Sequence, residues 1–283
     1  MANLLDEKIS VIIRTFNEAL YIENLLRSIK HQNYSNLEII LVDSESTDNT
    51  IRLAEPFCDK IVKIKKKDFT FGYSLNKGIE NSTGDYLVLV SAHTHPTSNQ
   101  WIKTLIKPLQ NPQIKMVYGK QSGDTHSWYP EFRDMMRTFP NRSKILNAPN
   151  YFSHNANSAL RKSDWDNYHF NDFLPGQEDI EWAKFWMDKG FSVYYEPCAE
   201  IIHSHKESWE QIYRRFLRES QAMTQIGVLN KLSIAKICLR ESLSVLLDCV
   251  SRMTSPKITE SQSGILRYRI IKIIASVHGI VSK

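Results

Sequence analysis

Several side chains with catalytic or ligand-binding chemistry directly follow apolar runs that are typical of buried strands. The run Tyr86–Val90 (YLVLV) ends in Ser91-Ala92-His93, and the run Glu38–Val42 (EIILV) ends in Asp43 and Ser44. Open α/β sheets bind their ligands beyond the carboxyl ends of the strands. Both strand ends are therefore candidate ligand sites.

Asp43 has the chemistry of a nucleotide-binding residue. A carboxylate at this place accepts hydrogen bonds from a base imide or a ribose hydroxyl, as acidic residues do in dinucleotide-binding folds. The alternative is a plain connection to a helix, because residues 43–50 (DSESTDNT) are rich in helix-capping side chains.

His93, together with His203 or His205, has the chemistry of a divalent-metal site. Imidazole suits Mn, Fe, Co, Ni and Zn, whereas Mg prefers oxygen ligands. A bound metal neutralises charge on a departing phosphate. The alternatives are that these histidines hydrogen-bond phosphate directly or only end strands.

Glu178 and Asp179 open a predicted helix over residues 177–190. One of these carboxylates could take a proton from an acceptor hydroxyl. The alternative is that the acidic residues only complement the helix dipole.

The elements that position these residues alternate between strands and helices. Such alternation predicts βαβ units and a parallel sheet. Strands are predicted at residues 9–13, 38–42, 60–64, 86–90, 115–118, 155–160, 192–195 and 199–202. Helices are predicted at residues 22–29, 50–56, 73–81, 101–109, 177–190 and 209–226, followed by further helices to residue 283. Residues 122–151 show no clear period.

The length fits one large α/β domain, or one domain plus a helical appendage, and the composition is ordinary for a globular protein. Of the 283 residues 42% are apolar, and the net charge is +5. The basic residues are dispersed, so we expect no nucleic-acid partner. The four cysteines form no CxxC pair and suggest free thiols in a reducing cytoplasm. We expect neither a signal peptide nor a transmembrane helix.

The tail Ile265–Val281 combines apolar residues with Arg267, Arg269 and Lys272. This pattern is typical of an interfacial amphipathic helix. It predicts peripheral contact with the inner face of the plasma membrane, or alternatively packing on the domain or on a second subunit in a homodimer.

Six sequence blocks, taken together and in this order, resemble family 2 glycosyltransferases of the GT-A fold. The resemblance covers roughly residues 8–220. The blocks are VIIRTFNE (11–18), LVDSESTDNT (41–50), FGYSLNKGI (71–79), GDYLVLVSAHTHP (84–96), GQEDIEW (176–182) and IHSH (202–205).

The resemblance implies a Rossmann-like α/β fold with a mixed, mostly parallel sheet flanked by helices. We expect a glycosyltransferase domain at 1–205, with a nucleotide-sugar half at about 1–96 and an acceptor half at about 97–205, and then a helical segment at 206–283. The implied reaction is inverting transfer from a nucleotide-diphosphate sugar to a hydroxyl of a glycan or lipid-linked acceptor. Bacterial surface polysaccharide synthesis in the cytoplasm would suit it.

The resemblance also assigns roles to individual residues. Asp179 matches the catalytic base, with Glu178 beside it, and His203 matches a histidine near the diphosphate. A divalent metal, Mn or Mg, is the implied cofactor, with His93 and His203 as its ligands. The residues expected around the donor are Thr15, Asn17, Glu18, Asp43, Ser44, Asn76, Lys77, Ser91, Ala92 and Asn157.

One departure from the family pattern concerns the Asp-x-Asp metal motif, which is replaced by Ser91-Ala92-His93. The first acid is absent, and His93 takes the place of the second, as in related enzymes with Asp-x-His. A catalytically inactive sugar-nucleotide-binding protein is therefore the alternative function. A nucleotidyltransferase is disfavoured, because Arg14–Glu18 has no glycine for a phosphate loop. A purely structural protein fits the polar strand ends least.

Overall fold

The computed structural model describes residues 7–123, 127–203, 207–253 and 262–282. The chain forms two compact units. The first comprises Met1–Ser122, Phe139–Leu174 and Glu178–His203, and the second comprises Gly123–Thr138, Pro175–Gln177 and Ser204–Lys283. The second unit thus includes two short segments from the middle of the chain besides the C-terminal one.

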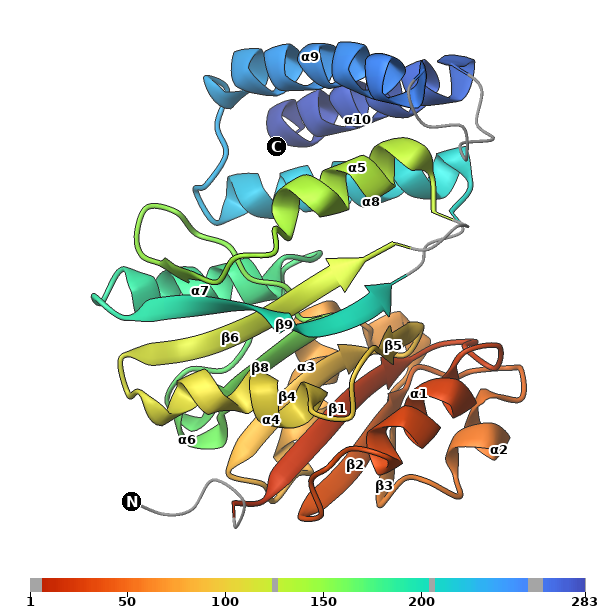
Figure 1. The fold of residues 1–283 in the computed structure, drawn as a ribbon, viewed down its shortest axis with the longest axis vertical. Coiled ribbons are helices and arrows are strands. Elements are labelled where there is room, and N and C mark those ends of the chain that lie inside the picture. Colours follow the sequence, from red (N-terminus) through yellow and green to blue (C-terminus); the bar gives the residue numbers. More distant parts are fainter. Residues whose placement is uncertain (1–6, 124–126, 204–206, 254–261, 283) are drawn as a thin grey trace. The chain divides into compact units, whose positions relative to one another are not determined.

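The first unit is built on a nine-stranded mixed sheet in the order β3-β2-β1-β4-β8-β6-β9-β5, with β7 paired to β9 (Figure 1). Pairing is parallel between β1, β2, β3 and β4 and between β6 and β9, whereas β5, β7 and β8 run the other way. The expected mixed, mostly parallel α/β sheet is confirmed. The strands are β1 (Ile9–Thr15), β2 (Leu37–Asp43), β3 (Lys60–Lys63), β4 (Tyr86–Ser91), β5 (Thr94–Pro96), β6 (Ile114–Ser122), β7 (Lys144–Leu146), β8 (Asn157–Arg161) and β9 (Ser192–His203).

Helices cover both faces of this sheet. On one face, α1 and α4 pack on alternate residues of the central strands, among them Val11, Ile13 and Val88. On the other face, α3 approaches so closely that a Cβ atom on Gly78 would lie 2.5 Å from Ile12 Cγ2. The helices of the unit are α1 (Ile22–Lys30), α2 (Thr50–Ala54), α3 (Phe71–Glu80), α4 (Trp101–Ile106), α6 (Lys162–Asn167) and α7 (Glu178–Met187), with single 3-10 turns at Lys66–Asp68 and Lys107–Gln110.

Three differences from the sequence-based elements concern the middle of the chain. The aperiodic segment 122–151 contains a helix, α5 (Tyr129–Thr138), and the short strand β7. The two strands expected at 192–195 and 199–202 are one continuous strand, β9. Short elements such as β5 and α6 carry too few residues for a periodic pattern, which explains why they were not expected.

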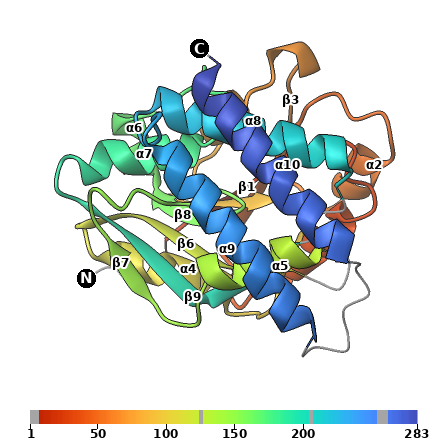
Figure 2. The same cartoon turned by 90° about the horizontal axis from the view of Figure 1, so that it is seen from above.

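The second unit is helical. It contains α5, α8 (Trp209–Gln225), α9 (Ser233–Met253) and α10 (Gln262–Val281). Helix α10 packs against both α8 and α9 (Figure 2). A Cβ atom on Gly279 would lie 2.6 Å from the Leu217 carbonyl oxygen, so only glycine permits this approach of α10 to α8. Among the described residues, no helix combines the length and apolar character needed to span a bilayer.

Candidate active site

Asp43, at the end of β2, lies beside Thr15, at the end of β1, in the parallel register of the sheet. Both side chains are buried. Asp43 Oδ2 accepts a hydrogen bond from the Ser46 N–H at 3.0 Å. Asp43 Oδ1 and Thr15 Oγ1 have no hydrogen-bond partner in the described part of the chain. Buried polar atoms are rarely left unsatisfied, so these two oxygens mark a place for a polar ligand.

The loop after β1 holds the loop after β2 in place. Asn17, at a left-handed φ of 56°, accepts a hydrogen bond from the Thr47 N–H at 2.8 Å, and its own N–H donates to Ser46 Oγ at 2.9 Å. The Glu18 N–H donates to Thr50 Oγ1 at 2.7 Å. Asn17 therefore positions the segment around Asp43 through its side chain, and Ser44 is held there by a backbone bond to Thr15.

His93 and His203 come together at the carboxyl ends of β4 and β9. Their ring centroids are 5.0 Å apart with the planes at 30°. His93 Nδ1 lies 2.8 Å from Glu18 Oε1, and His203 Nδ1 lies 2.6 Å from Gln121 Oε1. The structure brings together the two histidines that were expected to act on one ligand, whereas His205, the alternative to His203, lies outside the described residues.

The hydrogen bonds of these two rings suit a metal site. Each Nδ1 faces an oxygen acceptor, which assigns the proton to Nδ1 and the lone pair to Nε2, the form in which imidazole binds a metal. A partner at the second ring nitrogen is the usual orienting contact of a metal-binding histidine. Within the described ranges, however, no three His, Cys, Asp or Glu side chains gather into a metal cluster. The two imidazoles by themselves are fewer than the ligands that a protein-only metal site needs.

Asp179 lies in the first turn of α7 and is almost fully buried. Its Oδ2 accepts from the Asn155 N–H and its Oδ1 from the Ile180 N–H, both at 2.8 Å. Burial raises the pKa of Asp179 to about 6, against the opposing effect of these backbone hydrogen bonds and of the Arg14 charge. A carboxyl with this pKa can lose and regain a proton near neutral pH.

Glu178 links Asp179 to the end of β1. Asn155 Nδ2 donates to Glu178 Oε1 at 3.1 Å, and Arg14 Nη1 lies 3.6 Å from the same oxygen. Burial raises the pKa of Glu178, as does the neighbouring Asp179, whereas Arg14 lowers it. The Arg14 guanidinium therefore opposes the effect of burial on the pKa of both carboxyls.

The histidine pair and the carboxylate pair belong to one continuous constellation. Asn155, which binds both carboxylates, follows His154, whose ring lies 6.4 Å from that of His203. Arg14 pairs with Ser91 in the sheet, two residues before His93. The site thus brings together ends of β1, β4 and β9 and the start of α7.

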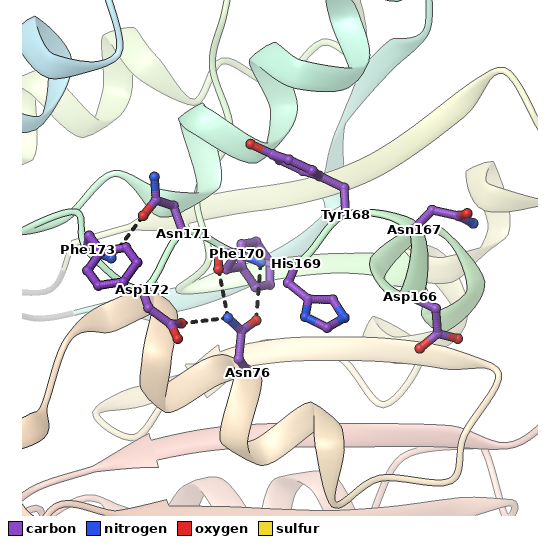
Figure 3. Close-up of a pocket in the computed structure, with 9 residues that line it drawn as sticks. All are labelled: Asn76, Asp166, Asn167, Tyr168, His169, Phe170, Asn171, Asp172 and Phe173. Atoms are coloured by element: carbon purple, nitrogen blue, oxygen red, sulfur yellow. Dashed lines mark hydrogen bonds between the residues drawn. The ribbon is translucent and has the colours of Figure 1, made fainter.

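Two residues expected at the donor have their polar groups engaged inside the protein. Asn76, on α3, donates to the Phe170 carbonyl and to Asp172 Oδ1 at 2.7 Å each (Figure 3). It also accepts a hydrogen bond from Trp165 Nε1 at 2.9 Å. Asn157 is fully buried and bonds Trp101 and the carbonyls of Lys120 and Ala199. The side-chain amides of both residues are thus held by partners within the protein.

The remaining expected residues occupy different settings. Lys77 is partly exposed on α3 and pairs with Glu80 at 2.7 Å. Ala92 is a core residue, and Ser91 accepts a hydrogen bond from Thr94 through its carbonyl. The open pocket that Asn76 borders is lined by residues 166–173 and has a volume of about 600 Å³ (Figure 3).

Arg14, Gln121, His154 and Asn155 belong to the site but were not predicted from the sequence. Arg14 directly precedes the expected Thr15, so its place at a strand end was a usable signal. Gln121 carried no such signal, because its role depends on the pairing of β6 with β9.

The model of the family described as glycosyl transferase family 2 matches residues 10–168. Two relatives align over most of the chain. The O-antigen chain rhamnosyltransferase RfbN of Salmonella typhimurium is 27% identical over 224 residues, 74% of this chain and 70% of its own length. The dolichyl N-acetyl-alpha-D-glucosaminyl phosphate 3-beta-D-2,3-diacetamido-2,3-dideoxy-beta-D-glucuronosyltransferase of Methanococcus voltae is 28% identical over 223 residues, 70% of this chain and 66% of its own.

Among solved structures, the fold resembles that of the mannosyltransferase PcManGT from Pyrobaculum calidifontis in complex with GDP-Man and Mn²⁺. The TM-score is 0.61 at 19% identity, over 96% of this chain and 86% of the other. At this identity the likeness concerns the fold.

Proposed function

Because the chain belongs to glycosyl transferase family 2, a family of inverting glycosyltransferases, we propose that it transfers a sugar from a nucleotide-diphosphate sugar to a hydroxyl of a lipid-linked glycan. The observation that carries this proposal is the constellation at the carboxyl edge of the sheet. It combines two buried oxygens that have no hydrogen-bond partner in the described residues, Asp43 Oδ1 and Thr15 Oγ1. It also contains the imidazole pair of His93 and His203 and the Asp179 carboxyl, whose pKa is raised.

Asp43 and Thr15 would receive the nucleotide. A base imide or ribose hydroxyl can donate to Asp43 Oδ1, an oxygen that the described protein leaves unsatisfied. Asn17 keeps the surrounding loop in the conformation that presents this oxygen. Glu18 would act indirectly, because its carboxylate orients the His93 ring.

Asp179 would act as the base in a single displacement. Its deprotonated carboxylate accepts the proton of the acceptor hydroxyl while that oxygen forms a bond to the anomeric carbon and the bond from this carbon to the diphosphate breaks. The configuration at the carbon is inverted. Two backbone N–H groups hold the carboxylate, and each of its oxygens has a second lone pair for the incoming proton. The Arg14 charge lowers its pKa and so favours the deprotonated form.

His93 and His203 would hold a divalent metal, Mn or Mg, through Nε2. When bound, the metal neutralises negative charge on the diphosphate as it leaves. Imidazole ligands favour Mn over Mg. The side-chain oxygens of Glu18 and Gln121 hold the Nδ1 atoms of the two rings, which would leave the Nε2 atoms to bind the metal.

The relatives support the acceptor class. The name of the Methanococcus relative specifies a dolichyl phosphate-linked acceptor, and the Salmonella relative acts on the O-antigen chain. We accordingly propose a lipid-linked glycan in bacterial surface polysaccharide synthesis, and a place of action at the cytoplasmic face of the membrane. Residues 1–96 would form the nucleotide-sugar half and residues 97–205 the acceptor half.

The test of catalysis is Asp179→Asn. We expect turnover to fall by about 10²–10⁴-fold, with nucleotide binding unchanged. Glu181→Gln is the matched control, because Glu181 lies in the same helix turn and accepts its hydrogen bond from Tyr168. Full transfer by Asp179→Asn would overturn the assignment of the base. Absence of both transfer and donor hydrolysis in the unaltered protein would favour the inactive-binder alternative.

The test of the donor site is calorimetry with UDP, GDP, dTDP and CMP, with and without Mn²⁺. We expect one nucleotide to bind tightly and Asp43→Asn to weaken it by at least about tenfold, the loss of one charge-assisted hydrogen bond. Asp68→Asn, an exposed acid in the first unit, is the control. If none of these nucleotides binds, the proposed donor class is wrong.

A further inference from the structure

Helix α9 has its polar side inside and its apolar side outside. Its buried residues include Glu241 (1% exposed) and Asp248 (0%), whereas Leu239 is 73% exposed, Leu246 64% and Val250 62%. Positions 239, 243, 246 and 250 recur at the spacing of one helix face. A helix on the surface of a globular protein normally shows the opposite arrangement.

Buried ion pairs fix α9 in this orientation. Arg269 of α10 is fully buried and bonds Glu241 Oε2 at 2.8 Å and Asp248 Oδ2 at 2.6 Å. Arg137 of α5 reaches the other oxygen of Asp248 at 2.7 Å. Turning α9 to bury its leucines would break both bonds and leave the buried Arg269 charge with Asp134 of α5 as its carboxylate partner, at a cost in stability. The outward direction of the leucines is therefore imposed by the interior.

Helix α10 extends the exposed apolar surface. It packs against α9 and exposes Leu266, Ile270 and Ile274 to about half of their area. We name these side chains together the leucine face. It consists of Leu239, Leu243, Leu246, Leu247 and Val250 of α9 with Leu266, Ile270 and Ile274 of α10.

Positive charge accompanies the leucine face. Lys236 and Arg240 follow one edge of the face on α9, and Arg267 is exposed on α10. The second unit contains 15 Lys and Arg residues against 9 Asp and Glu, whereas the rest of the chain contains 21 against 22. The net positive charge of the protein thus belongs to the unit that carries this face.

We propose that the leucine face docks on the surface of an anionic phospholipid bilayer, with α9 and α10 lying in the interface. Apolar side chains on two adjacent helices, bordered by basic residues, have the chemistry that such a surface recognises. A second copy of the chain is less well matched, because burying the apolar residues against an identical face gives the basic side chains at its edge no anionic partner, whereas an anionic bilayer does.

This surface differs from the one expected for the tail. The expectation of a membrane-binding tail rested on the pattern of apolar residues with Arg267, Arg269 and Lys272, but Arg269 is buried and Lys272 pairs with Asp134 at 2.5 Å. The proposal instead relies on α9. It rests on the proposed function only in that a lipid-linked acceptor gives the docking a purpose, and its test requires no catalysis.

The test is co-sedimentation of the full-length protein with vesicles of phosphatidylethanolamine and phosphatidylglycerol, at roughly three to one, and with phosphatidylcholine vesicles. We expect binding to the anionic vesicles that weakens with salt. Leu243→Glu with Leu246→Glu should weaken it by at least about tenfold. Lys236→Gln with Arg240→Gln should weaken it by about fivefold per charge.

The matched control is Ile145→Glu with Phe173→Glu, which adds the same charge at exposed apolar residues of the first unit. This control should stay within about twofold of the unaltered protein. If circular dichroism shows that the glutamate variant of α9 is unfolded, Leu243→Ser with Leu246→Ser replaces it.

Equal loss in the control pair, or no vesicle binding by the unaltered protein, would overturn the proposal. So would a change of oligomeric state in the α9 variant with vesicle binding unchanged, which would identify a second copy as the occupant. Nucleotide binding by the α9 variant should be unchanged. Failure of docking is thereby distinguishable from failure of the proposed function.

Discussion

His203 stacks on His93 with the ring centroids 5.0 Å apart, and each ring directs its Nδ1 to a different side-chain oxygen. The contact arises because Thr94, next to His93, pairs with His203 across strands β5 and β9. Two histidines far apart in the sequence therefore share one site. The orientation of the two rings depends on their contacts with Glu18 and Gln121.

Replacing Gln121 by Leu should weaken Mn²⁺-promoted nucleotide binding by about 10–100-fold, the usual effect of removing the orienting partner of a metal ligand. The His203 ring remains in this variant, but its Nδ1 loses the oxygen that fixes its orientation. Calorimetry with and without Mn²⁺ measures the effect. His31→Ala removes an exposed imidazole at the C-terminal end of α1 and serves as control. If Mn²⁺ promotes nucleotide binding equally in Gln121→Leu and in the unaltered protein, the assignment of His203 to the metal site is wrong.

The pH profile of transfer should report Asp179. Burial raises its pKa to about 6, and a base acts only when deprotonated. We expect kcat/KM to fall about tenfold per pH unit below pH 6. Arg14→Gln removes a positive charge that lowers the pKa of both carboxyls, so the acid limb should move to higher pH. Arg52→Gln, an exposed arginine, should leave the limb in place. If the acid limb of the kcat/KM profile lies at the same pH in Arg14→Gln, the Arg14 charge does not lower the pKa of the catalytic carboxyl as predicted.

Asn76→Ala should destabilise the fold without weakening nucleotide binding. The substitution leaves Trp165 Nε1 and the Phe170 N–H without their acceptor, at about 1–3 kcal/mol for each buried donor. Thermal unfolding measures the loss, and calorimetry at low temperature measures the affinity. Asn167→Ala, which removes one exposed side-chain bond, is the control. A tenfold loss of affinity in folded Asn76→Ala would restore its expected place at the donor.

Glu38→Gln should change the acid stability of the first unit. Burial acts to raise the pKa of Glu38, but hydrogen bonds from Ser10 and Thr83 and the contact with Lys8 outweigh it and lower the pKa to about 2. The folded-state pKa is depressed, so this stabilisation is present above the unfolded value of 4.5 and is lost as the pH falls toward 2.

The Glu38→Gln variant should therefore be less stable than the unaltered protein at pH 7, by about 1–3 kcal/mol, and it should lose less stability between pH 4.5 and 2. Denaturant unfolding at several pH values measures both quantities. Glu23→Gln, on the exposed side of α1, serves as the reference. Parallel stability curves for the unaltered protein and Glu38→Gln would contradict the prediction.

The central strands and their helices could be predicted from the sequence, because apolar runs such as Ile39–Val42 form strands that are buried on both faces. The segment 122–151 could not. Its helix α5 buries Tyr129, Pro130 and Glu131, a set without an apolar period, so the pattern that identifies helices was absent.

For the candidate site too, the placement of some residues could be predicted from the sequence and that of others could not. Asp43 and His93 follow predicted strands, so their presence at the carboxyl edge of a sheet was predictable from their order in the chain. Asp179 opens a predicted helix. Asn76 and Asn157 are polar residues of the same kind, but their hydrogen bonds turn inward. The sequence contains no signal that separates an asparagine facing a ligand from one that supports the core.

By itself, the amino-acid sequence determined the helices and strands that carry a clear apolar pattern and the side chains that stand at their ends, because periodicity and end positions are local properties. Only the tertiary structure decided which of these ends meet and which way a helix faces. His203 meets His93 through the pairing of β5 with β9. Helix α9 turns its leucines outward because Arg269, from another helix, binds its carboxylates inside. Such choices depend on partners that are distant in the chain, and no local pattern contains them.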